Sequence, residues 1–381
     1  MQLFDEPTPP KTHLSDNQKL AWLRLIRSEN VGPATFKRLI NRYGTVDAAL
    51  NALPALAARG GAAKPIKVCP TEDAIREIEQ LNKLGGRLVA LGEPDFPPLL
   101  AHASGAPPLL SVLGQARFDM QKSLAIVGAR NASAAGMALT RQLASELGQE
   151  GYIIISGLAR GIDSAAHAAS LKNGTVAVFA GGVDHIYPEQ NRDLAQSIVD
   201  NGGLLVSEMP LGTRPIARDF PRRNRIVAGI SLGVMVVEAA IRSGSLITAR
   251  LANEQNRDVM AIPGFPLDPR AAGGNKLIRD GATLVRNVDD IIEQLNTFEL
   301  SQPTLFNEDE EEFATEWDMD QAPNATDEVL SALSHTPIAI DEVIRATNLP
   351  AQAVQMVLLD LEIAGRIERS AGQLVNIKLS A

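Results

Sequence analysis

The sequence predicts an α/β protein whose centre is a doubly wound, mostly parallel sheet of the extended Rossmann-like type. Between residues 123 and 245, apolar runs of strand length, such as residues 125–127 and 153–155, alternate with helix-like stretches. Each run ends in a loop built from Gly, Ser, Asn and Arg. Because such loops gather at one edge of a parallel sheet, we expect them to form a ligand crevice suited to phosphate.

A helical domain is predicted before the sheet, over residues 1–70. Apolar side chains recur at helical spacing in residues 16–27, and a glycine turn at residues 30–35 leads into a second helix over residues 36–42. This pattern resembles a helix-hairpin-helix or sterile-alpha-motif-like unit, whose turn would offer N–H groups to DNA phosphates. A small helical packing or interaction domain fits the pattern equally well.

A winged-helix domain is predicted after the sheet, over residues 325–381. Three helix-like stretches precede two strand-like ones that flank a glycine turn. The third helix, residues 351–364, would read DNA in such a fold, but it carries two glutamines together with Asp360 and Glu362. This composition favours a protein contact over recognition of a DNA groove.

The central domain is predicted over residues 71–296, and an acidic linker over residues 297–324. The chain has a net charge of -9, but residues 287–344 contain sixteen acidic side chains and no Lys or Arg. The rest of the chain carries 36 basic and 29 acidic residues, a net charge of +7, which suits an anionic partner. We hypothesise that the acidic residues 308–312 compete with this partner for the crevice; a solvated spacer is the alternative.

The composition predicts a cytoplasmic protein that does not enter the membrane. Its single cysteine, Cys69, excludes a disulfide framework and is expected to be a packed side chain. The sequence has neither a signal-peptide pattern nor an apolar run that could span a bilayer.

No catalytic residues, cofactor or metal are expected. The sequence lacks the Gly-rich patterns of ATP and dinucleotide sites, and its histidines lack the spacing of metal ligands. Ser156, Asp163 and His167 could be considered for a hydrolytic triad, but Ser156 lacks the Gly-x-Ser-x-Gly context. Asp163 and His167 are four residues apart on one expected helix, which a structural role explains.

A basic string carries Arg222, Arg223 and Arg225 within four positions, so not all three can lie on a buried face. Pro221 suggests that a helix begins there, which places the arginines near its positive end. Their mutual repulsion requires compensation, either by an anionic ligand or by carboxylates such as Glu208. The first alternative is a phosphate site, and the second is an intramolecular ion-pair network.

Six strings occur in an order that resembles the DNA-processing protein A family (DprA, also called Smf). They cover the central domain, and both end domains match versions of the family's architecture. The strings are Val-Gly-Ala-Arg (127–130), Ser-Gly-Leu-Ala-Arg-Gly-Ile-Asp (156–163), Asp-His-Ile-Tyr-Pro (184–188), Phe-Pro-Arg-Arg-Asn-Arg (220–225), Ser-Gly-Ser-Leu-Ile-Thr-Ala (243–249) and Pro-Gly (263–264).

The resemblance implies a bacterial cytosolic protein, not an enzyme, that forms a homodimer and binds and protects incoming single-stranded DNA. It further implies that the protein loads the RecA recombinase during natural transformation. Glu189 departs from the family, because some relatives have a basic residue at this point. The expected DNA- and phosphate-binding residues are Gly128, Arg130, Ser156, Gly157, Arg160, Phe220, Arg222, Arg223, Asn224, Arg225, Ser243, Gly244 and Ser245.

The alternative is a nucleotide-binding enzyme of the nucleoside-monophosphate phosphoribohydrolase type. Glu238, close to the Ser-Gly-Ser string at residues 243–245, weakly resembles the acidic residue of such enzymes. One phosphate needs one or two arginines, whereas several loops supply arginines here, so a polymer is the better fit. A purely structural adaptor would leave these arginines unexplained.

Overall fold

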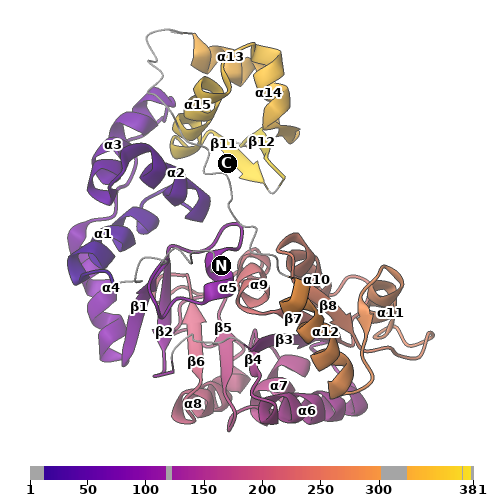
Figure 1. Ribbon diagram of the computed structural model, residues 1–381. Coiled ribbons are helices and arrows are strands. Elements are labelled where there is room, and N and C mark those ends of the chain that lie inside the picture. The colour runs from indigo at the N-terminus through magenta and orange to yellow at the C-terminus, as the bar shows by residue number, and fades with distance from the viewer. Residues whose placement is uncertain (1–12, 117–121, 302–323, 371, 379–381) are drawn as a thin grey trace, which may run out of the picture. The chain divides into compact units, whose positions relative to one another are not determined.

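The chain divides into two compact units, which are described separately (Figure 1). The sheet unit comprises residues 1–15 and 76–305, and the end unit comprises residues 16–75 and 306–381. The two predicted end domains therefore belong to one unit, while the boundaries expected at residues 70, 296 and 324 stay predictions. This computed structural model describes residues 13–116, 122–301, 324–370 and 372–378.

The sheet unit contains a sheet of nine strands within the described residues, in the order β1-β2-β6-β5-β4-β3-β7-β8-β9. All neighbours from β6 to β9 pair in parallel, whereas β2 pairs antiparallel with both β1 and β6. The chain order reverses between β3 and β7, so this doubly wound, mostly parallel sheet has its switch point there. The strands are β1 Gly86–Ala90, β2 Leu109–Leu113, β3 Ser123–Gly128, β4 Ile153–Ser156, β5 Thr175–Val178, β6 Leu204–Ser207, β7 Gly233–Val237, β8 Asp258–Ala261 and β9 Thr283–Leu284.

Helices cover both faces of this sheet, which is why its strands are apolar on both sides. Leu124 and Ile126 of β3 belong to a core with α6, α7 and α12, and the alternating Ala125 and Val127 belong to a core with α5, α9 and α10. Figure 1 shows α6 and α7 on the side of the sheet opposite α9 and α10. The helices are α5 Pro98–Ala101, α6 Ala134–Gln149, α7 Ile162–Ala169, the 3-10 helix η1 Glu189–Asn191, α8 Arg192–Asp200, α9 Asp219–Ile230, α10 Gly244–Glu254, α11 Ala272–Arg279 and α12 Val288–Ser301.

The end unit contains the predicted helical hairpin and the predicted winged helix. The three strands of the wing follow the antiparallel order β10-β12-β11, and α4 leads from this unit into the sheet unit. The elements are α1 Asp16–Arg27, α2 Pro33–Tyr43, α3 Val46–Arg59, α4 Thr71–Lys83, α13 Ala325–Ala332, β10 Ile338–Ala339, α14 Ile340–Thr347, α15 Ala351–Ile363, β11 Ile367–Ser370 and β12 Leu374–Ile377.

Helix α15 joins the two halves of the end unit. Val357 and Leu358 lie in the core of the winged helix, whereas Leu359 and Ile363 lie in the core of the N-terminal helices, together with Leu53. This helix packs against the N-terminal part of the same chain, and the predicted role in contact with another protein stays a prediction.

The structure also bears on the predictions for Cys69, the acidic linker and membrane spans. Cys69 is buried and unbridged, as expected. Helix α12 extends to Ser301, over the first residues of the predicted linker, and the hypothesis on residues 308–312 lies outside the described residues. Among the helices that the structure describes, none has both the length and the apolar character that a membrane span requires.

Candidate nucleic-acid interface

The loops that carry the predicted site residues meet at the carboxyl edge of the sheet. Arg130 follows β3, Arg160 follows β4 and Ser243 follows β7, and these three strands are neighbours in the sheet. Helix α9, which carries the basic string, contacts β3, β4 and β5 and packs against α10. The structure thus brings the predicted loops together at the switch point, where open α/β sheets bind ligands.

Phe220 contacts both a guanidinium group and a second aromatic ring. The Cζ atom of Arg130 is 5.5 Å from the centroid of the Phe220 ring, and the centroids of Phe220 and Tyr187 are 5.7 Å apart. These three side chains form an aromatic platform (Arg130, Tyr187 and Phe220), in which Tyr187 is 50% exposed and Phe220 is partly buried. An accessible ring beside a cation suits the stacking of nucleobases. Tyr187 belongs to the Asp-His-Ile-Tyr-Pro string (184–188) but is not among the predicted site residues.

Three arginines at this edge are available to an anion. Arg130, Arg160 and Arg222 are exposed, and none of them forms an ion pair with another described residue. They come from three different segments: the loops after β3 and β4, and the first turns of α9. A ligand that binds all three must carry several negative charges, since each guanidinium group favours its own phosphate or carboxylate.

Arg223 has a different role, because its side chain is only 7% exposed. Its Nη1 donates to the carbonyl oxygen of Val178 at the end of β5, over 2.7 Å. A Cβ atom on Gly157 would lie 1.8 Å from the same nitrogen, so the guanidinium group occupies the space that this glycine leaves free. Burial lowers the pKa of Arg223 to about 10, with the charge of Asp163 opposing this shift, and Arg223 stays charged at neutral pH.

Asp163 organises the loop after β4. Its Oδ2 accepts hydrogen bonds from the N–H groups of Gly157, at 3.1 Å, and Ala159, at 3.2 Å. Burial raises the pKa of this carboxyl group, while the charge of Arg223 opposes the rise. Ser156 is fully buried and its Oγ donates to the carbonyl oxygen of Ile126 over 2.6 Å. Ser156 and Gly157 therefore hold the loop in place and do not present these donors to a ligand.

His167 completes this buried group. The hydroxyl of Thr175 donates to the carbonyl oxygen of Ile154, so we infer that its oxygen accepts a hydrogen bond from Nδ1–H of His167, 2.7 Å away. Nε2 is buried and has no hydrogen-bond partner among the described residues. Burial, followed by the charge of Arg223, lowers the pKa of His167 to about 3. These contacts favour the structural explanation of Asp163 and His167 over a hydrolytic triad.

The neutral His167 predicts that the protein loses stability in acid. Its pKa is lower in the folded chain than the unfolded value of 6.5, so its contribution is complete above pH 6.5 and is lost as the pH falls toward about 3. Between pH 7.5 and pH 5 we expect a loss of roughly 2 kcal/mol in the free energy of unfolding. Urea unfolding of the wild type and of His167→Asn at both pH values measures it. An equal loss in the variant would contradict this assignment.

The remaining residues of the basic string join α9 to its neighbours. Arg225 Nη2 donates to the carboxylate of Glu208, and both side chains are mostly buried. Asn224 Nδ2 lies 3.5 Å from the carbonyl oxygen of Gly244, in the first turn of α10. The two alternatives for this string therefore apply to different members: Arg225 belongs to an ion pair, and Arg222 faces solvent. Helix α9 begins at Asp219, two residues before Pro221.

The small residues after β3 and β7 serve close packing and capping. A Cβ atom on Gly128 would lie 1.9 Å from the carbonyl oxygen of Val237, so only glycine lets β3 approach β7 here. Ser243 caps α10 by accepting from the N–H of Ser245, whose side chain is buried. Gly244 between them is exposed.

Two acidic residues near the crevice have partners of their own. Glu238 accepts hydrogen bonds from the N–H and the hydroxyl of Ser133 and thereby fixes the start of α6, so its carboxylate is already occupied. This weakens the enzyme alternative. Glu189 is exposed and lies 3.4 Å from the guanidinium group of Arg192, a surface pair that contributes little.

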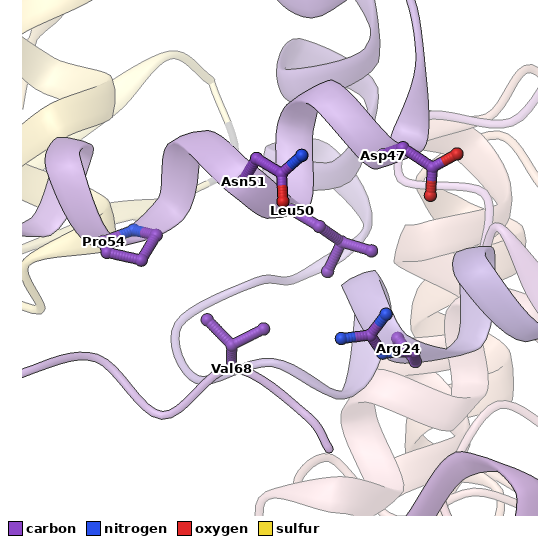
Figure 2. Close-up of a pocket in the computed structure, with 6 residues that line it drawn as sticks. All are labelled: Arg24, Asp47, Leu50, Asn51, Pro54 and Val68. Carbon is purple, nitrogen blue, oxygen red and sulfur yellow. The ribbon is translucent and has the colours of Figure 1, made fainter. Parts of the chain in front are cut away.

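A separate hollow of about 500 Å³ lies within the N-terminal helices. Figure 2 shows the six side chains around it, which come from α1, α3 and the segment before α4. Nε of Arg24 donates to the carbonyl oxygen of Cys69, so this cation is already engaged. The residues that line it are Arg24, Asp47, Leu50, Asn51, Pro54 and Val68.

The fold is that of a doubly wound α/β protein, with exposed arginines from three segments at the carboxyl edge of its sheet. Residues 87–296 match the family of DNA recombination-mediator protein A, residues 16–79 match a DprA-like N-terminal HHH domain, and residues 318–373 match a DprA winged helix domain. The chain belongs to the DNA recombination-mediator protein A family.

Individual relatives agree with this assignment. Protein Smf of Synechocystis is 33% identical, over 94% of this chain and 98% of its own length. The X-ray structure of DNA processing protein A from Streptococcus pneumoniae has a TM-score of 0.60 and 34% identity, over 74% of this chain and 98% of that chain. A DNA processing protein A from Helicobacter pylori, described with a single-stranded DNA binding mode, has a TM-score of 0.51 and 29% identity, over 56% and 96%.

Proposed function

We propose that this protein binds single-stranded DNA in the crevice at the carboxyl edge of the sheet, and that it acts as a binding protein and not as an enzyme. The observation that carries the proposal is the aromatic platform flanked by unpaired arginines from three segments. In a duplex the bases are stacked on one another, whereas a single strand can place its bases on exposed rings. The family assignment and the Helicobacter pylori relative support the same conclusion.

The predicted site residues divide into three groups in this proposal. Arg130, Arg160, Phe220 and Arg222 contact the strand, with Tyr187 added from the structure. Asn224, Ser243 and Gly244 line the neighbouring surface. The others position these contacts from within the protein. This third group consists of Gly128, Ser156, Gly157, Arg223, Arg225 and Ser245.

By the same proposal the protein acts in the cytoplasm as a homodimer, protects DNA strands taken up during natural transformation, and loads RecA onto them. The family assignment supports a role in DNA processing. The RecA contact and the dimer rest on the resemblance of the central strings. Neither requires a cofactor.

A salt titration tests the binding mode. We expect a single-stranded oligonucleotide to bind more tightly than a duplex or a mononucleotide at matched salt. Three exposed arginines predict a slope of about -2 in log affinity against log salt, at roughly -0.7 per neutralised phosphate. Fluorescence anisotropy with the three ligands measures both quantities. Equal or tighter binding of the duplex to the crevice would contradict the proposal.

A further inference from the structure

Four arginines surround two carboxylates within the end unit. The carboxylates belong to Asp360 and Glu362 of α15, the helix that would enter a groove if the winged helix read DNA. The arginines come from the N-terminal helices and from the wing. They are Arg38 and Arg42 of α2, Arg59 at the end of α3, and Arg369 of β11.

Asp360 is almost completely buried, at 2% exposure, between the two arginines of neighbouring helices. Its Oδ2 accepts from Nε of Arg59 at 2.9 Å, and its Oδ1 lies 3.7 Å from Nη1 of Arg42. Burial raises the pKa of Asp360, and the hydrogen bond and charge of Arg59 oppose this rise. This carboxylate therefore depends on the N-terminal helices for its charge compensation.

Glu362 contacts α2 and the wing. Its Oε1 accepts from the hydroxyl of Thr35 in the first turn of α2, at 2.8 Å, and its Oε2 accepts from Nη2 of Arg38. Nε of Arg369 lies 3.2 Å from the same carboxylate. Next to it, Nδ2 of Asn30 in the hairpin turn donates to the carbonyl oxygen of Ile363 at 3.0 Å.

The two carboxylates do not neutralise the cluster. Four guanidinium groups face two negative charges, and both Nη1 of Arg42 and Nη2 of Arg369 are buried without a hydrogen-bond partner among the described residues. Burial, with the positive charge of Arg38 next, lowers the pKa of Arg369 to about 10. Each carboxylate thus occupies a place where an oxygen of a phosphodiester would find the same donors.

We propose that this arginine cluster is a second binding site for the phosphate backbone of DNA, and that α15 covers it in the closed form of the end unit. Asp360 and Glu362 take the positions of two phosphates. DNA binds there only when α15 moves away from α2 and α3. This site lies in the end unit and is independent of the crevice in the sheet unit.

A glycine allows the closed form. A Cβ atom on Gly60, which follows α3, would lie 2.1 Å from the carbonyl oxygen of Asp360 and 2.7 Å from Cβ of Ala364. The φ angle of Gly60 is -70°, so alanine fits the backbone conformation at this position. Gly60→Ala therefore acts as a wedge against α15 without changing any charge.

Full-length variants test the proposal in an Arg130→Ala/Arg222→Ala background, which weakens the crevice. The test variant is Gly60→Ala/Asp360→Asn/Glu362→Gln. The control is Asp341→Asn/Glu342→Gln on α14, which removes the same charge from two exposed side chains. We expect the test variant to bind a short DNA duplex roughly tenfold more tightly than the control at low salt. Its salt slope should be steeper by about 2, at roughly -0.9 per phosphate.

Hydrogen exchange of the α15 amides reports whether the end unit has opened, and Arg38→Ala/Arg42→Ala added to the test variant should abolish the gain. Opening without tighter duplex binding than the control would overturn the proposal. An end unit that stays closed in the test variant would also overturn the proposal, because the two carboxylates then do not keep α15 in the closed form. The same three substitutions are also made in a protein that retains Arg130 and Arg222. The affinity of this protein for single-stranded DNA should not fall, and this measurement tests the proposed function separately.

Discussion

Replacing Arg223 by methionine is expected to lower the free energy of unfolding by about 3–5 kcal/mol, the usual cost of leaving a buried charge uncompensated. The substitution leaves Asp163 buried without its compensating charge and removes the hydrogen bond to Val178. Methionine fills much of the same volume, so the loss reports charge and hydrogen bonding more than a cavity. Urea unfolding at pH 7 measures it.

The pH dependence identifies the cause of this loss. Arg223 opposes the rise in the pKa of Asp163, so this pKa should rise further in the variant. A carboxyl group with a raised pKa in the folded chain contributes most below its unfolded pKa and loses that contribution as the pH rises. The deficit of Arg223→Met should therefore shrink between pH 7 and pH 4. Asp163→Asn should recover part of it at pH 7, and a deficit that is constant with pH would point to packing alone.

Removing the aromatic platform is expected to have the largest effect on single-stranded DNA. Arg130→Ala removes a charged contact worth about 1.5–3 kcal/mol, and Phe220→Ala removes stacking worth about 1–3 kcal/mol per base. Because the two side chains touch, their losses should not simply add. We expect the double variant to bind roughly 100-fold to 1000-fold more weakly, as measured by anisotropy at constant salt.

Arg141→Ala is the matched control, since Arg141 is an exposed arginine on α6 away from the crevice loops. This variant should change the affinity for single-stranded DNA less than twofold, because it loses only one positive charge that attracts DNA without contacting it. If Arg130→Ala lowers the melting temperature by several degrees yet binds DNA normally, Arg130 stabilises the fold and does not contact the strand.

Local patterns predicted most of the elements of the sheet unit. The apolar runs became β3, β4, β5 and β7 because both faces of the sheet are covered, which calls for continuous apolar strands. The parallel topology also predicted that the loops gather at one edge of the sheet. It could not predict the direction of single side chains, because Arg222 and Arg223 are adjacent in one string while Arg222 is exposed and Arg223 is buried. Arg223 turns inward, where it donates to the carbonyl oxygen of Val178 on β5 and fills the space beside Gly157, contacts that the local sequence does not reveal.

The pairing of the end domains could not be predicted from local patterns. Arg59 and Asp360 are 301 residues apart in the sequence, and no motif links them. The acidic side chains of α15 made groove reading unfavourable, but they carry no information about the part of the chain that they contact. The contacting residues are arginines on α2 and α3. In the sequence of these two helices alone, they have the pattern of an ordinary basic helix surface.

The position of α15 near the end of the chain also has a consequence for synthesis. The N-terminal helices are made first, yet Leu359 and Ile363, which complete their core, follow after the whole sheet unit. With 301 residues between Arg59 and Asp360, translation at about 5–20 residues per second leaves an interval of roughly 15–60 seconds. During this time the nascent helices expose apolar surface and unpaired arginines on the ribosome. The core of the end unit is thus completed only after the sheet unit has been translated, although α1, α2 and α3 precede that unit in the sequence.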